Sequence, residues 1–219
     1  MARHPGPVLV DTNAILESFR IGAWRALSGG YTVETVKDCV IETQTGFQRR
    51  RTEQQIEVVE LRALLAAVHE VADQELAQMA VLASNISLDT GERSLWAHAL
   101  ARNDGWVLCG PDKASLRFGV RLGYRDRLVA LERLLDEAGY RPKEPLKPAY
   151  TTKWLEKTLG NSFFRKEWEE HDNIGRCLHP TPSSGLWSAL EAVHRRIPIV
   201  ENGFGGSLAP AGFWTARRP

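Results

Sequence analysis

The sequence predicts an α/β fold in which helices cover both faces of a mostly parallel central sheet. Short apolar runs typical of strands alternate along the chain with segments of helical periodicity. Residues 106–109 are apolar throughout, which is typical of a strand buried on both faces. The 219 residues are 43% hydrophobic and 25% charged, as in an ordinary globular protein with a core large enough to fold unaided.

In the first half of the chain, strands are expected at residues 7–10, 31–33 and 67–71. A helix through Ile15 and Phe19 closes near Gly22. Helical spacing resumes after Thr35, which is a candidate N-cap, and again over residues 52–65. Asp73 is expected to begin a further helix that runs to Leu82.

In the second half, a helix follows the turn at residues 89–92, and the strand at 106–109 comes next. The remaining elements are a helix that stops at Gly123, a short strand at residues 128–129, and a helix that closes at Gly139. This predicts a body at residues 1–140. Residues 141–219 are expected to form an extension with helical and irregular parts, joined through a linker at 141–149 that holds three prolines in nine positions.

Charge and composition exclude several classes of protein. Lys and Arg number 28 against 27 Asp and Glu, and no stretch approaches the ~20 apolar residues of a membrane span. The three cysteines are far apart and do not form a disulfide framework. The N-terminal residues do not resemble a signal peptide. We therefore expect a soluble, cytoplasmic protein that does not bind membranes.

Acidic residues follow the predicted strands and begin the predicted helices. Asp11 and Asp112 each come at the end of a strand, Glu92 begins the helix between them, and Glu42 lies on the helix after the second strand. The carboxyl ends of parallel strands share one edge of a sheet, where ligands bind. Carboxylates gathered there repel one another unless a hard divalent cation such as Mg²⁺ or Mn²⁺ binds them. Such a site suits phosphoryl transfer by a metal-activated water.

At these residues the chain resembles the PIN-domain family of metal-dependent ribonucleases. The similar stretches are Val8-Leu9-Val10-Asp11-Thr12-Asn13, Val40-Ile41-Glu42, Leu88-Asp89-Thr90-Gly91-Glu92 and Val107-Leu108-Cys109-Gly110-Pro111-Asp112-Lys113. The resemblance spans about residues 8–139 and implies a three-layer α/β/α sandwich that binds one or two Mg²⁺ or Mn²⁺ ions.

By position, the resemblance implies catalytic roles for Asp11, Glu42, Glu92 and Asp112. Of these, Asp11, Glu92 and Asp112 would hold the metal, and Glu42 would complete or orient the shell. The resemblance further implies that Thr12 and Asn13 support the first acid.

Two features of the pattern leave alternatives open. The family often has a second acid beside the last one, whereas Lys113 and Ser115 follow Asp112 here. Ser115 is a candidate for a water-mediated position, and the number of metal ions stays open. Asp38 lies one helical turn before Glu42 and competes with it, but the apolar Val40 and Ile41 before Glu42 favour the latter.

Helix capping is the competing explanation for these acids. Asp11, Asp89 and Asp112 each stand where Asp is favoured as an N-cap, and Glu92 has capping-box spacing from Asp89. We favour the metal site because three separate helix starts carry acids at one predicted edge.

Basic and aromatic residues offer weaker signals of nucleic-acid binding. Arg49, Arg50, Arg51 and Lys113 are candidate phosphate contacts. The aromatic stripe that begins at Trp154 is expected to pack on the body or on a partner subunit, as in a homodimer, rather than stack on bases. His171, Cys177 and His179 have spacing that suits zinc but lack a fourth ligand nearby.

The sequence therefore predicts a nuclease that hydrolyses phosphodiester bonds, with single-stranded RNA as its substrate. One alternative is the toxin of a toxin–antitoxin pair, which an antitoxin-like protein partner would hold inactive. The other is a PIN-fold scaffold that binds RNA or protein without cleaving it.

Overall fold

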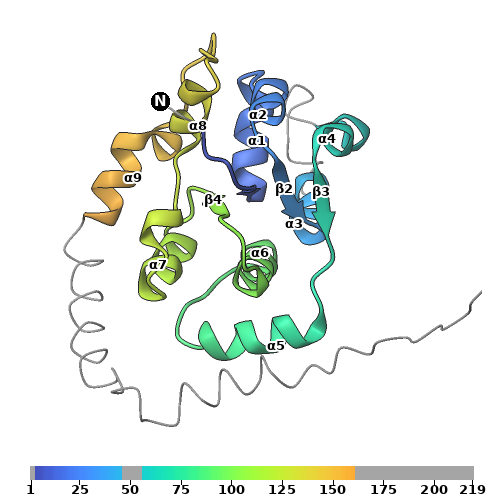
Figure 1. Ribbon diagram of the computed structural model, residues 1–219, viewed down its shortest axis with the longest axis vertical. Coiled ribbons are helices and arrows are strands. Elements are labelled where there is room, and N and C mark those ends of the chain that lie inside the picture. Colours follow the sequence, from blue (N-terminus) through green and yellow to red (C-terminus); the bar gives the residue numbers. More distant parts are fainter. Residues whose placement is uncertain (1–2, 46–55, 161–219) are drawn as a thin grey trace, which may run out of the picture. The chain divides into compact units, whose positions relative to one another are not determined.

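A computed structural model describes residues 3–45 and 56–160 and contains a parallel four-stranded sheet (Figure 1). The strands are β1 (Val8–Val10), β2 (Val33–Val36), β3 (Ala67–His69) and β4 (Val107–Cys109). Their order in the sheet is β3-β2-β1-β4, and each neighbouring pair is parallel. The α/β class with a parallel sheet is thus confirmed.

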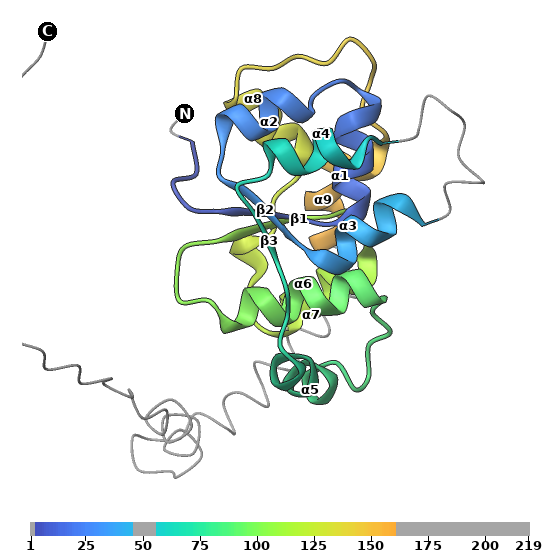
Figure 2. The same ribbon diagram turned by 90° about the vertical axis from the view of Figure 1, so that its right-hand side faces the viewer.

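Helices cover both faces of the sheet (Figure 2). On one side lie α1 (Thr12–Arg20), α2 (Trp24–Gly30), α4 (Val58–Leu64) and α8 (Leu131–Glu137). On the other side lie α5 (Asp73–Leu82), α6 (Thr90–Ala101) and α7 (Lys113–Arg121). The remaining α-helices are α3 (Lys37–Gln44), which contacts both α1 and α6, and α9 (Thr152–Leu159), which contacts α7 and α8. Short 3-10 helices occupy Arg125–Arg127 and Pro148–Tyr150.

Strand β1 lies inside the sheet and is apolar at every position. Successive side chains of a strand point to opposite faces of the sheet. Leu9 packs in the hydrophobic cluster that contains Trp96, whereas Val8 and Val10 pack in the other cluster, with Trp24. Both faces of β1 are covered, which accounts for its three apolar residues.

The cluster around Trp96 joins α6 to α7 and to β4. The Trp96 ring meets those of Trp106 and Phe118 edge to face, with centroid separations of 5.9 and 5.3 Å. A Cβ on Gly119 would lie 2.7 Å from the Trp96 ring, so only glycine fits beneath it. The Trp96 indole N–H donates to the Ser115 hydroxyl at 2.8 Å, which satisfies a polar group that would otherwise be buried without a partner.

Two local predictions differ from the structure. Thr35 does not cap a helix: it lies inside β2, where its hydroxyl donates to the Val10 carbonyl at 2.7 Å, and α3 begins two residues later. The predicted strand at residues 128–129 is reduced to a single parallel bridge between Leu108 and Leu128 at the edge of the sheet.

The proline-rich segment and α9 lie against the first 140 residues. Arg20 donates to the Pro145 carbonyl, the Lys147 backbone N–H donates to Glu17, and the Tyr150 hydroxyl donates to the Asn13 carbonyl. The aromatic stripe beyond Trp154 lies outside the described residues from position 161 onward. Within residues 3–45 and 56–160, none of the helices combines the length and the apolar character needed to cross a membrane.

Glu17 is the buried charge that fastens this segment to α1. It accepts two hydrogen bonds from Arg20, at 2.6 and 2.8 Å, and one from the Lys147 N–H at 2.8 Å. Burial alone would raise the pKa of Glu17, but these hydrogen bonds outweigh it and lower the pKa below its usual value of 4.5. The stabilisation is therefore complete at neutral pH and is lost as the pH falls through that lowered pKa.

We expect Glu17→Gln to lower the free energy of unfolding by about 1–3 kcal/mol at pH 7, because the amide keeps only one acceptor oxygen and loses the charge that pairs with Arg20. Glu60→Gln is the matched control, since Glu60 pairs with Arg25 on the exposed surface and should cost less than about 1 kcal/mol. Urea denaturation of both variants tests this. Equal losses of unfolding free energy in the two variants would show that the buried Glu17 stabilises the fold no more than an exposed ion pair does.

Candidate functional site

The pairing of β1 with β4 places two of the predicted acids at the carboxyl edge of the sheet. Val10 lies opposite Cys109, and the Asp11 backbone N–H continues the ladder by donating to the Cys109 carbonyl at 3.2 Å. Asp11, which follows β1, therefore lies beside the segment that follows β4 and leads to Asp112. A Cβ on Gly110 would come within 2.6 Å of the Asp11 carboxylate, so any larger residue here would force that carboxylate to move.

Helices α1, α6 and α7 are each capped by an acid at this end of the sheet, as the capping interpretation predicted. Asp11 accepts from the Ala14 N–H at 2.6 Å, and Asp112 accepts from the Ala114 N–H at 2.6 Å. Asp89 and Glu92 form a reciprocal capping box, with bonds of 2.8 and 3.1 Å. Capping does not exclude metal binding, because a carboxylate has two oxygens and about four lone-pair sites.

Glu42 of α3 connects two of these helix starts. Its carboxylate accepts from the Thr12 hydroxyl at 2.6 Å and from the Gly91 N–H at 2.8 Å. A side chain on Gly91 would collide with this carboxylate, because a Cβ there would lie 2.4 Å from its nearer oxygen. Asp38, the alternative to Glu42, instead accepts a hydrogen bond from Ser94, further along α6.

The acids lie close enough for their negative charges to raise one another's pKa values. Burial raises the pKa of Asp11 to about 7, and the charges of Asp89, Asp112 and Glu42 add to this against the opposing Ala14 hydrogen bond. Burial likewise raises the pKa of Glu92 to about 8, helped by the charges of Asp112 and Asp89 and by a hydrogen bond with Asp112. We call Asp11, Glu42, Asp89, Glu92 and Asp112 the acidic site.

Asp89 was predicted only as a cap, yet its charge raises the pKa values of the two buried acids, Asp11 and Glu92. Its spacing from Glu92 was the one signal in the sequence, because a capping box holds its two carboxyl groups close together.

The predicted supporting residues occupy different surroundings. Thr12 contacts Glu42 directly, whereas Asn13 is exposed and its carbonyl accepts from Tyr150. Ser115 is buried, and its hydroxyl accepts the Trp96 indole N–H. Lys113 is exposed at the first position of α7, beside Asp112. Arg49, Arg50 and Arg51 lie outside the described residues.

The donor set of the acidic site fits a hard cation. Carboxylate oxygens are preferred by Mg²⁺ and Mn²⁺, and two buried acids with raised pKa values gain most from a compensating positive charge. The carboxylates of the acidic site lie further apart than the ligands of a closed metal shell. Within the described residues, the three ligand atoms that lie within 4.8 Å of one another belong to a different group, Glu34, His69 and His98. Mg²⁺ tolerates this separation because it keeps several waters and needs only one or two carboxylates.

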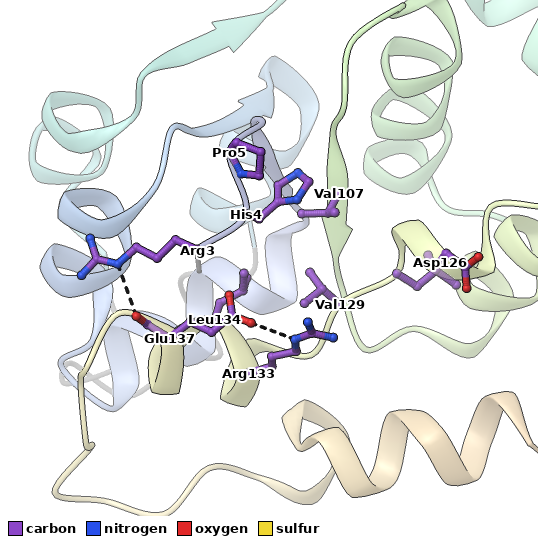
Figure 3. A pocket seen from close by; sticks show the side chains of 10 residues that line it. Arg3, His4, Pro5, Val107, Asp126, Val129, Arg133, Leu134 and Glu137 are labelled. Atoms are coloured by element: carbon purple, nitrogen blue, oxygen red, sulfur yellow. Dashed lines mark hydrogen bonds and ion pairs between the residues drawn. The ribbon is translucent and has the colours of Figure 1, made fainter. Parts of the chain in front are cut away.

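A pocket of about 360 Å³ lies at the amino ends of the strands, beside Val107, the first residue of β4 (Figure 3). Its charged lining residues bond to nearby groups: Arg133 donates to the Glu137 carboxylate at 3.0 Å, and Arg3 donates to the Glu137 carbonyl at 3.3 Å. His4 lies 2.6 Å from the Gly105 carbonyl. None of the acids of the acidic site lines this pocket, so the two features are separate.

Neither a scan against models of known protein families nor a search of curated proteins found a match for this chain.

We expect the protein without divalent cations to lose stability as the pH rises from about 6.5 to about 8, since below about 6.5 the lowered pKa of the half-buried His98 opposes the effect of Asp11 and Glu92. Asp11 and Glu92 bind protons more tightly when folded than when unfolded, so their ionisation favours the unfolded state. Asp11→Asn keeps the capping oxygen and removes one charge. It should therefore stabilise the protein at pH 8 in EDTA by at least about 1 kcal/mol, since one pKa unit corresponds to about 1.4 kcal/mol.

Thermal melts at pH 6.5 and pH 8 measure this effect, with the exposed Asp136→Asn as the control. A wild-type protein that is equally stable at both pH values, or a gain common to both variants, would contradict mutual repulsion in the acidic site.

Proposed function

We propose that this chain is a metal-dependent nuclease with a PIN-like fold that hydrolyses phosphodiester bonds in single-stranded RNA. The observation that carries the proposal is the acidic site, where carboxylates from separate segments meet at the edge of a parallel sheet that typically binds ligands. Buried acids with raised pKa values are typical of functional sites.

In this proposal Asp11, Glu92 and Asp112 bind Mg²⁺ or Mn²⁺ directly or through water. A bound ion of this kind supplies a water of lowered pKa and offsets negative charge on the phosphate. Glu42 orients the site, since it is bonded to the residues next to Asp11 and Glu92. Lys113, which is exposed beside Asp112, would contact a substrate phosphate.

The two described cysteines near the acidic site support attack by water rather than by a thiolate. Burial and the charge of Asp11 raise the pKa of Cys39 to about 12 and that of Cys109 well above its usual range. Both thiols therefore stay protonated at neutral pH and are poor nucleophiles.

We expect wild-type protein to cleave labelled single-stranded RNA with Mn²⁺ or Mg²⁺ and to stop in EDTA. Asp112→Asn should lower the rate by at least about 10–100-fold, because changes even to groups behind metal ligands cost that much. The amide that replaces the Asp112 carboxylate can still accept the α7 capping bonds through Oδ1, so the fold should survive. Asp136→Asn is the control for a change of charge alone.

Cleavage that persists in Asp112→Asn would point to contamination or another site and would contradict the proposal. Another outcome is that wild type cleaves no RNA and yet is stabilised by Mn²⁺, while Asp112→Asn is not. That result would show that the acidic site binds the metal and would favour a toxin-like enzyme with a narrow target. RNA binding that is insensitive to metal would favour a non-catalytic scaffold.

A further inference from the structure

A second cluster of ligating side chains lies away from the acidic site. Glu34 of β2, His69 of β3 and His98 of α6 bring one ligand atom each to within 4.8 Å of the others. We call these three residues the histidine site. His98 lies six residues beyond Glu92 on α6, a rise of about 9 Å along the helix axis.

Sheet register explains why these residues meet. Glu34 and Val36 are two residues apart on β2 and share a face of the sheet. His69 pairs with Val36, so it lies on that same face, next to Glu34. Helix α6 contacts β2 and brings His98 to them. The site is therefore built on a helix and two paired strands rather than on a loop.

The arginine at the end of α6 bonds to two of the three residues. Arg102 Nη1 lies 2.5 Å from a Glu34 carboxylate oxygen and 3.0 Å from His98 Nε2. A guanidinium group only donates hydrogen bonds, so His98 Nε2 must accept and carries a lone pair. The charged nitrogen of Arg102 thus contacts the same two ligand atoms that a metal cation would bind.

His69 completes the arrangement. Its Nε2 lies 2.8 Å from the same Glu34 oxygen and donates to it, because a carboxylate only accepts. The rings of His69 and His98 are stacked with centroids 4.0 Å apart, and one ligand atom of each lies within 4.8 Å of the other. To bind a metal through Nε2, His69 has to carry its proton on Nδ1 instead, and one ring has to turn so that both in-plane lone pairs point at the ion.

We propose that Glu34, His69 and His98 form a Zn²⁺ site in which Arg102 competes with the metal. Two imidazoles and one carboxylate are a donor set typical of zinc, with a fourth position left for water. The oxygen-only acidic site, in contrast, suits Mg²⁺ or Mn²⁺. When zinc binds, Arg102 releases Glu34 and His98 and keeps its pair with Asp104, to which its Nε already donates at 2.8 Å.

Zn²⁺ titration of the full chain against a chromogenic chelator, in excess Mg²⁺, tests the proposal. His98→Gln and His69→Gln should each weaken one Zn²⁺ site by at least about tenfold. Arg102→Gln should tighten the same site by about tenfold or more, because it removes the competing cation. A merely structural role for Arg102 would not produce tighter binding. Circular dichroism checks that each variant is folded.

Matched controls locate the zinc that is measured. His4→Gln changes a histidine that contacts Gly105 instead, and His179→Gln changes a candidate ligand elsewhere in the sequence. Both should leave this Zn²⁺ affinity unchanged, as should Asp112→Asn, which separates this proposal from the proposed nuclease. Co²⁺ bound in place of zinc should give a visible absorption band that His98→Gln abolishes.

Two results would overturn the proposal. One is Zn²⁺ affinity that is unchanged by His98→Gln and His69→Gln. The other is the failure of both wild type and Arg102→Gln to bind Zn²⁺, which would identify the cluster as an internal hydrogen-bond network that only supports the sheet.

Discussion

Mutual repulsion among carboxylates held at one edge of the sheet is the constraint on which the proposed activity depends. Parallel pairing of β1 with β4 brings Asp11 and the turn before Asp112 to the same place. Burial and neighbouring charge then raise the pKa of Asp11 to about 7 and that of Glu92 to about 8. Such an arrangement costs stability unless protons or a cation neutralise it, and a functional site is where such a cost is tolerated.

Local structure around the acids keeps them close despite this repulsion. Gly110 lets the chain after β4 approach Asp11, and Gly91 lets Glu42 reach the start of α6. The backbone N–H groups of three helix starts donate to the acids that cap them, so the same interactions that begin the helices also hold the site. Helix α6 additionally carries Glu92 at its first turn and His98 near its last, and so links the acidic site to the histidine site.

The sequence predicted features that depend on local pattern and missed those that depend on pairing. The strands at residues 7–10 and 106–109 were visible because both of their faces are buried, and Asp11 and Asp112 because they follow those strands directly. Thr35 was predicted to cap a helix because Val36, which belongs to β2, has helical spacing from Cys39 and Val40 of α3. The histidine site was not predictable, since Glu34 and His69 are 35 residues apart and meet only through the register of β2 with β3.

Proton release on Mn²⁺ binding would show whether the buried carboxylates bind the metal ion. Calorimetric titration at pH 7, in two buffers of different ionisation enthalpy, measures how many protons leave for each ion bound. Since Asp11 and Glu92 are partly protonated at this pH, binding at the acidic site should release about one proton or more. Mn²⁺ binding without proton release, or no binding at all, would contradict the account.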